Sequence, residues 1–159
     1  MTMKKAWNIA NLPVYSLATY HERVVNMNIC TYVTAVSMTP KLFAVAVYEN
    51  TKTLDNLRDS DIAVLQLLAA EQYPLVRKLG QQSGFEYSKA DYLNRRKLLE
   101  QWQSFPVLKE VSARFLLRRL EHIPTGDHHL FIFEVTKSQS ISLNHLQLQH
   151  LRERKIIRG

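Results

Sequence analysis

Glycine is scarce in this chain, which contains only Gly80, Gly84, Gly126 and Gly159. The dinucleotide-binding fingerprint G-x-G-x-x-G, the phosphate-binding loop G-x-x-x-x-G-K-[ST] and the nucleophile elbow G-x-S-x-G all need closely spaced glycines. None of these patterns occurs in the sequence. If the protein binds a nucleotide, it must therefore do so by another device.

Cysteine and long apolar runs are also missing. Cys30 is the only cysteine, so no disulfide can form within the chain, and a reducing, cytoplasmic setting is the simplest interpretation. No apolar run approaches the roughly 20 residues of a membrane-spanning helix, and no secretory signal is recognisable at the N-terminus. With 159 residues, 46% of them hydrophobic, we expect one globular domain over residues 1–159.

Acidic residues are outnumbered, and the formal net charge is +7. Such a balance can indicate nucleic acid, an anionic surface or a phosphorylated ligand. The basic groups at 95–97, 118–119 and 152–158 are spread along the chain. A nucleic-acid-binding module needs aromatic residues interleaved with a basic patch. That pattern is missing, so scattered surface charge is the simpler interpretation and nucleic acid is not expected as a partner.

Most of the recognisable elements are strands. Runs rich in Val, Ile, Thr and Tyr predict strands over 13–20, 24–36, 42–48, 62–68, 113–120 and 128–136. Helical spacing predicts one helix through Leu54 and Leu57, with Thr51 or Thr53 as its N-cap, and further helices over 73–79, 89–102 and 146–154. Because strands and helices do not alternate regularly, the order favours a mostly antiparallel barrel with helices outside it.

Three segments carry more specific information. Residues 26–57 read NMNICTYVTAVSMTPKLFAVAVYENTKTLDNL, residues 79–84 read LGQQSG, and residues 126–131 read GDHHLF. In this order they resemble the core of the flavin-reductase-like family, and the resemblance extends over residues 13–137. It implies a mainly β fold with helices: an FMN-binding split β-barrel, largely antiparallel, with peripheral helices.

The chain departs from the family pattern at three positions. Pro40 is the only proline in a turn where the family often has two, and Cys30 stands where the family often has serine. Phe133 stands where the family usually has glycine. Its bulk could change the pocket or a dimer contact.

The resemblance implies a site for the FMN phosphate. A phosphate dianion is bound by hydroxyls, backbone N–H groups, a cation and a helix N-terminus. From spacing alone, Thr31 and Thr34 are more simply strand residues, and Lys52 and Thr53 a loop residue and a helix cap. The resemblance favours the phosphate site. The cofactor-binding residues that the resemblance implies around the phosphate are Thr31, Thr34, Asn50, Thr51, Lys52, Thr53, Asn56 and Ser83.

The resemblance also implies contacts to the flavin ring, largely through backbone groups. These are expected from Asn28, Ile29, Cys30, Thr31, Tyr32 and Val33. The Asn28 amide can bond the ring edge. Tyr32 either packs on the flavin or is a core aromatic residue, and both alternatives remain open. Cys30 is expected to be a small buried residue and not a reactive thiol.

His128 is the candidate catalytic residue. In the resembling family, the corresponding histidine lies near the flavin face where the nicotinamide or acceptor binds. The alternative is a turn histidine bonded to Asp127 or the backbone. His129 should point to the opposite face of its strand, so the pair is a poor metal site, and no other spacing resembles a metal motif.

The implied function is an NAD(P)H-dependent flavin reductase with FMN as cofactor, FAD and riboflavin being the alternatives. The resemblance further implies a homodimer whose partner chain completes the pocket, and a monooxygenase that receives reduced flavin. A rival hypothesis keeps the fold and the flavin but assigns an electron carrier or sensor with little nicotinamide activity.

Overall fold

The computed structural model describes residues 4–158, and most of its strands form one antiparallel sheet. The order in the sheet is β2-β1-β5-β8-β9-β4-β3. The strands are β1 (Tyr15–His21), β2 (Val24–Met27), β3 (Val33–Ser37), β4 (Leu42–Tyr48), β5 (Ile62–Leu67), β8 (Ala113–Pro124) and β9 (His128–Ser140). A separate hairpin pairs β6 (Leu99–Trp102) with β7 (Phe105–Leu108). The expected mainly β, antiparallel architecture is confirmed.

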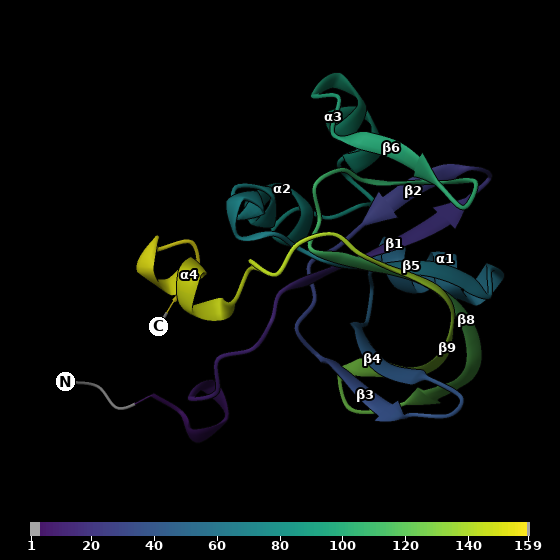
Figure 1. The fold of residues 1–159 in the computed structure, drawn as a ribbon, viewed down its shortest axis with the longest axis horizontal. Helices are drawn as coiled ribbons and strands as arrows, with labels where there is room; N and C mark the ends of the chain where they lie inside the picture. The colour runs from purple at the N-terminus through teal and green to yellow at the C-terminus, as the bar shows by residue number, and fades with distance from the viewer. Residues whose placement is uncertain (1–3, 159) are drawn as a thin grey trace.

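The sheet curls because its two longest strands bend. Strands β8 and β9 pair antiparallel, with register shifts between Leu116 and Leu117 and between Arg119 and Glu121. Such bulges increase local twist and bend a strand pair. Figure 1 shows β8 and β9 curving from the β5 side of the sheet round to β4 and β3. The sheet therefore forms an open barrel.

Strands β1 and β5 are buried on both faces, which explains their nearly continuous apolar character. Inside the barrel, Leu17 and Leu65 belong to a core cluster that includes Phe131 and Phe133. On the opposite face, Ala18 and Val64 belong to a second cluster under the outer helices. The fold thus has two cores on either side of the β1–β5 pair.

The helices lie on both sides of this pair. Helix α1 (Lys52–Asp59) packs Leu54 and Leu57 into the barrel cluster. Helices α2 (Leu75–Gly80), α3 (Lys89–Arg95) and α4 (Leu148–Glu153) cover the other cluster. Short 3₁₀ turns occupy η1 (Ala6–Asn8) and η2 (Ala70–Gln72). Within residues 4–158, the structure has no helix of the length and apolar character that crossing a membrane requires.

Two sequence expectations are wrong. The strand expected over 24–36 is divided into β2 and β3 by residues 28–32, because this segment leaves the ladder of β2. It is held instead by β1: the Asn28 side chain accepts from the backbone N–H of Leu17 at 2.9 Å. Cys30 forms a bridge with Tyr15. The strand expected to be continuous therefore contains a loop that faces a cavity.

The helix expected over 89–102 is also wrong beyond its first half. Helix α3 ends at Arg95, and Lys97 adopts a left-handed φ of 55°. The backbone N–H of Leu98 then bonds the carbonyl of Leu93 at 3.0 Å, which is a common way for a helix to end. The remaining residues form β6, whose hairpin with β7 was not expected from the sequence.

Candidate functional site

The main cavity has a volume of about 530 Å³ and lies where the two halves of the fold meet. One wall is the loop between β2 and β3, and another is the end of β4 with the start of α1. Loop 80–84, Lys89 and His128 supply most of the rest of the lining. The lining residues are Asn26, Asn28, Ile29, Cys30, Thr31, Tyr32, Ala46, Val47, Tyr48, Asn50, Thr51, Lys52, Thr53, Leu79, Gly80, Gln81, Gln82, Ser83, Gly84, Lys89 and His128.

Most of the site residues expected from the sequence meet in this cavity. Those that line it are Asn28, Ile29, Cys30, Thr31, Tyr32, Asn50, Thr51, Lys52, Thr53, Ser83 and His128. Val33, Thr34 and Asn56 do not line it. Thr34 is exposed on the edge strand β3. Asn56 is only 2% exposed and donates from its amide to the Thr19 hydroxyl at 3.1 Å, so its position fits a structural role in the fold.

The start of α1 gives the cavity its hydroxyl-rich side. Asn50 adopts a left-handed φ of 56°, which turns the chain from β4 into the helix. Thr51 is the N-cap: its hydroxyl accepts from the Leu54 N–H at 3.2 Å and donates to the Tyr48 carbonyl at 2.8 Å. Lys52 and Thr53 follow in the first turn, where unpaired backbone N–H groups and the helix dipole favour an anion.

Two glycines allow loop 80–84 to approach this side closely. A Cβ added at Gly84 would lie 2.5 Å from the Asn26 side-chain oxygen and 2.8 Å from the Lys52 Cβ. A Cβ at Gly80 would lie 3.0 Å from the Ile29 side chain. Sequence analysis placed only Ser83 of this loop in the site. The two glycines, at positions 80 and 84, were the sequence feature that could have indicated the other residues of this loop.

Lys89 is a lining residue that sequence analysis missed. Its side chain is 6% exposed and its amine donates to the Leu79 carbonyl at 2.6 Å. Burial lowers the pKa of this amine to about 8. A lysine at the start of a polar helix gives no sign in the sequence that it will be buried.

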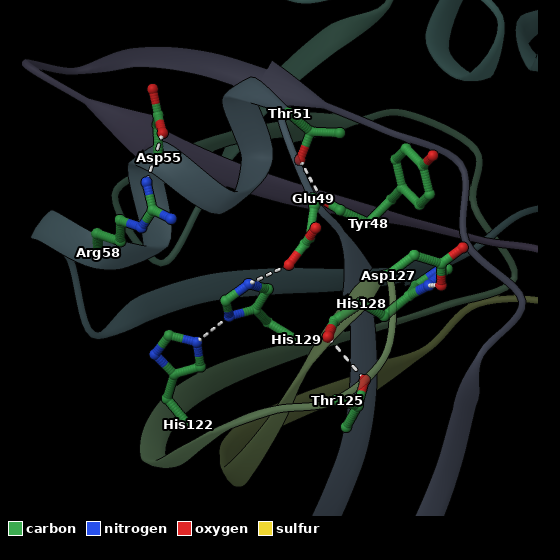
Figure 2. Close-up of polar contacts among 10 residues, drawn as sticks. All are labelled: Tyr48, Glu49, Thr51, Asp55, Arg58, His122, Thr125, Asp127, His128 and His129. Atoms are coloured by element: carbon green, nitrogen blue, oxygen red, sulfur yellow. Dashed lines mark hydrogen bonds and ion pairs between the residues drawn. The ribbon is translucent and has the colours of Figure 1, made fainter.

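Three rings form an aromatic group in the lining of the cavity. The His128 ring lies 5.1 Å from the Tyr32 ring and 5.2 Å from the Tyr48 ring, measured between centroids. His128 Nδ1 lies 2.6 Å from a carboxylate oxygen of Asp127 (Figure 2). Tyr32 is 60% exposed, which excludes the core alternative considered for it. His128 bonds Asp127, as the turn alternative expects, and it also lines the cavity, while its catalytic role stays a prediction.

His129 points to the opposite face of β9, as expected. Its ring lies 2.6 Å from the His122 ring between nitrogens and 3.3 Å from a Glu49 carboxylate oxygen (Figure 2). The pKa of His122 is lowered, first by desolvation and then by the charges of His129 and two nearby arginines. Among residues 4–158, no group of three or more His, Cys, Asp or Glu side chains is placed to hold a metal ion.

Two departures from the family pattern have clear positions. Cys30 is 8% exposed, and burial raises the pKa of its thiol to about 12, so the thiol stays protonated at neutral pH. Phe133 is fully buried in the barrel core and stacks on Phe131 with ring centroids 5.8 Å apart. It does not line the cavity, so its bulk fills the barrel and leaves the pocket unchanged.

The cavity fits a flavin nucleotide by its chemistry. Of the described residues that line it, none is Asp or Glu, and both Lys52 and Lys89 are cations. The hydroxyls and cations of the lining suit a phosphate dianion, and its aromatic rings suit a flat conjugated ring. Its volume is within the range of roughly 300–1,000 Å³ that is typical of small-molecule sites.

Known proteins share this architecture. FMN-binding protein from Thermus thermophilus with bound 1-cyclohex-2-enone has a TM-score of 0.76 at 23% identity, covering 88% of this chain and 76% of that one. Flavin reductase PheA2 in its native state has a TM-score of 0.76 at 24% identity, covering 89% and 88%. NADH:FAD oxidoreductase SgcE6 from Streptomyces globisporus C-1027 has a TM-score of 0.73 at 16% identity, covering 83% and 77%.

The sequence comparisons decide the family. No curated protein sequence matches the chain significantly. The family model described as flavin reductase like domain matches residues 10–153, which is nearly the whole chain. The chain therefore belongs to the flavin reductase like domain family and is a flavin oxidoreductase of the split-barrel fold.

Proposed function

We propose that the protein binds FMN in the main cavity and reduces it with NAD(P)H. The supporting observation is the lining of the cavity, which combines two lysines and several hydroxyls with the aromatic rings of Tyr32, Tyr48 and His128. FMN has the matching groups, with a phosphate dianion at one end and a flat ring at the other. FAD and riboflavin share the ring and are the alternatives to be compared.

The loop between β2 and β3 supports the ring edge in this proposal. The backbone of Cys30 is already bonded to Tyr15 in both directions, at 2.9 Å each. Ile29 and Thr31 are the neighbours of Cys30 and lie outside the helices and strands. Within residues 4–158, neither of them forms a backbone–backbone hydrogen bond. Their N–H and carbonyl groups therefore supply donors and acceptors for the ring, and Asn28 retains its amide N–H₂ group for the same purpose.

His128 and its neighbours form the wall for the reductant. A flavin held in this cavity would supply the chemistry of hydride acceptance from a reduced nicotinamide and of electron transfer to an acceptor. The bond to Asp127 holds the His128 ring in one orientation beside Tyr32 and Tyr48. This group orients the nicotinamide and excludes water from the reacting face, and no protein acid or base has to move a proton.

The test is a visible absorbance spectrum of the purified protein, followed by titrations with FMN, FAD and riboflavin. We expect saturable binding that is tightest for FMN, and oxidation of NADH or NADPH when flavin is present. Absence of flavin binding contradicts the proposal. Flavin binding without nicotinamide oxidation assigns the electron carrier or sensor function instead.

Assembly and downstream partner are part of the same proposal. The edge strand β3 and its surroundings expose apolar side chains, among them Tyr32, Val36 and Met38 at 60%, 50% and 87%. We propose that a second copy of the chain covers this face and completes the cavity.

BorF, similar in fold with a TM-score of 0.76, is the flavin reductase component of a two-component tryptophan halogenase. A monooxygenase that receives reduced flavin is the partner we propose by analogy.

The proposed compartment is the cytoplasm. The lone cysteine, Cys30, is free and buried, so the fold makes no use of a disulfide among the described residues. This is the usual pattern of proteins in a reducing compartment. Fractionation of the producing cells tests the location directly.

A further inference from the structure

The charge of Lys89 has no protein partner that explains its burial. Lysines are almost never buried unless paired, because taking an ammonium group out of water is costly. Lys89 is 6% exposed, yet no carboxylate within residues 4–158 forms an ion pair with it. It also stands in the first turn of α3, where the helix dipole disfavours a cation.

The hydrogen bonds of the amine leave capacity for a ligand. An ammonium group has three N–H donors. One of them donates to the Leu79 carbonyl at 2.6 Å, and this is the one side-chain hydrogen bond of Lys89 in the described part of the chain. That bond directs the amine to the base of loop 80–84, whose residues line the main cavity.

Lys89 lies at the hydroxyl-rich side of the site. It lines the main cavity together with Lys52, Ser83 and Gly84, and the same Lys52, Gly84 and Lys89 also line an adjoining cavity of about 360 Å³. The main cavity has no carboxylate among its described lining residues to neutralise these cations. Glu22 and Glu86 line the adjoining cavity, but neither forms an ion pair with Lys52 or Lys89 within residues 4–158. The two lysines therefore give the main cavity a positive side that suits an anion.

We infer that Lys89 binds the phosphate group of the flavin nucleotide and is the residue by which the site distinguishes phosphorylated flavins from riboflavin. This inference rests on the proposed flavin function and assigns a specific role within it. A desolvated ammonium group forms a stronger hydrogen bond to a phosphate oxygen than a solvated one does. Phosphate binding in turn compensates the charge that the fold leaves buried.

The first test compares Lys89→Met with Lys137→Met, a control that removes an exposed lysine of β9 outside the cavities. The flavin-free proteins are titrated with FMN and with riboflavin at pH 7. We expect Lys89→Met to weaken FMN binding by about tenfold or more, the usual effect of losing a charged hydrogen bond, and to change riboflavin binding less than about twofold. Lys137→Met should change neither by more than about twofold. Retained riboflavin binding shows that the variant is folded.

A second measurement uses the wild-type protein and does not depend on a variant. Burial lowers the pKa of Lys89 to about 8, so the amine loses its proton over the range pH 7–9.5. The dissociation constant of FMN relative to that of riboflavin should rise over this range, by a total of no more than the factor measured for Lys89→Met at pH 7 and at no more than about tenfold per pH unit. In Lys89→Met this slope should disappear, which separates Lys89 from the other titratable groups around the two cavities. Those groups are His21, Glu22, Lys52, Glu86, Tyr87, Cys30, Tyr32, Tyr48 and His128.

The outcomes distinguish this inference from the function on which it rests. If the wild-type protein binds neither FMN nor riboflavin, both are overturned. If the wild-type protein binds both flavins, but Lys89→Met weakens them equally or not at all, the Lys89 assignment fails alone. A flat ratio of the two dissociation constants across pH 7–9.5 in the wild-type protein has the same meaning.

Discussion

At the scale of single residues, the burial of Lys89 favours anion binding but lowers the stability of the fold. Its burial within the cavity wall, bonded only to the Leu79 carbonyl among described residues, keeps a cation where the fold alone would be more stable without one. The cavity lining offers no acidic neighbour in the described part of the chain. A site that must bind an anion benefits from this arrangement, since no ion pair within residues 4–158 competes with the ligand for the charge of Lys89.

The stability of the flavin-free protein should therefore depend on pH through Lys89. The folded pKa is about 8, against 10.5 for an ordinary lysine. Between these values the unfolded chain binds more protons than the folded protein, so stability rises with pH. Relative to Lys89→Met, the unfolding free energy of the wild-type protein should rise by at most about 1.5 kcal/mol between pH 8 and 9.5. Urea unfolding of both proteins at several pH values measures this difference. If the unfolding free energies of the two proteins changed equally with pH, the prediction would be wrong.

At the scale of elements, the sequence predicted best where one pattern decides the structure. The continuous apolar run at β4 has the predicted bounds, because a strand covered on both faces needs apolar residues throughout. The sequence pattern gave a wrong prediction where tertiary contacts determine the local structure. Nothing local shows that residues 28–32 leave the ladder to bond β1, or that Lys97 ends α3. Lys89 was missed for the same reason, since its burial depends on how α3 packs on β2.

The cap of α1 connects an element to the site. The Thr51 hydroxyl bonds both the Leu54 N–H and the Tyr48 carbonyl, so it fixes the turn from β4 into the helix. Thr51→Ala should lower the unfolding free energy by about 1 kcal/mol and Thr51→Ser by much less, because serine retains the hydroxyl. Urea unfolding at pH 7 measures both. Equal losses in the two variants would show that the methyl group, and not the hydroxyl, is the important contact.

The β8–β9 ribbon contains an acid-sensitive contact. His122 stacks on Phe131 with ring centroids 4.5 Å apart, and its lowered pKa means that the folded ribbon disfavours the protonated ring. As pH falls below the ordinary histidine value of 6.5, the unfolded chain takes up the proton first, so stability is lost. His122→Phe keeps the stacking and should lose less stability than the wild-type protein between pH 8 and 5. His21→Phe is the matched control, and equal acid sensitivity of wild-type protein and His122→Phe would refute this account.

At the scale of the whole molecule, the two cores leave an apolar face beside strand β3 exposed. The barrel cluster and the outer cluster bury their own side chains on either side of β1 and β5. Tyr32, Val36 and Met38 lie on or beside the edge strand β3, exposed by 50% or more. Exposed apolar side chains grouped at a sheet edge are typical of an interaction surface. Because Tyr32 also lines the main cavity, a partner on this face would close the site.

The assembly can be tested by placing charge on this face. The wild-type protein should have about twice the chain mass of 18.5 kDa by light scattering. The double variant Val36→Glu and Met38→Glu should have the mass of one chain, since buried carboxylates without partners are strongly disfavoured at an interface. Leu143→Glu is the control, because Leu143 is 97% exposed and lies after β9, away from the cavity. If the partner copy completes the cavity, the double variant should also bind FMN more weakly while Leu143→Glu does not. A wild-type protein with the mass of one chain would contradict the proposal that a second copy covers this face.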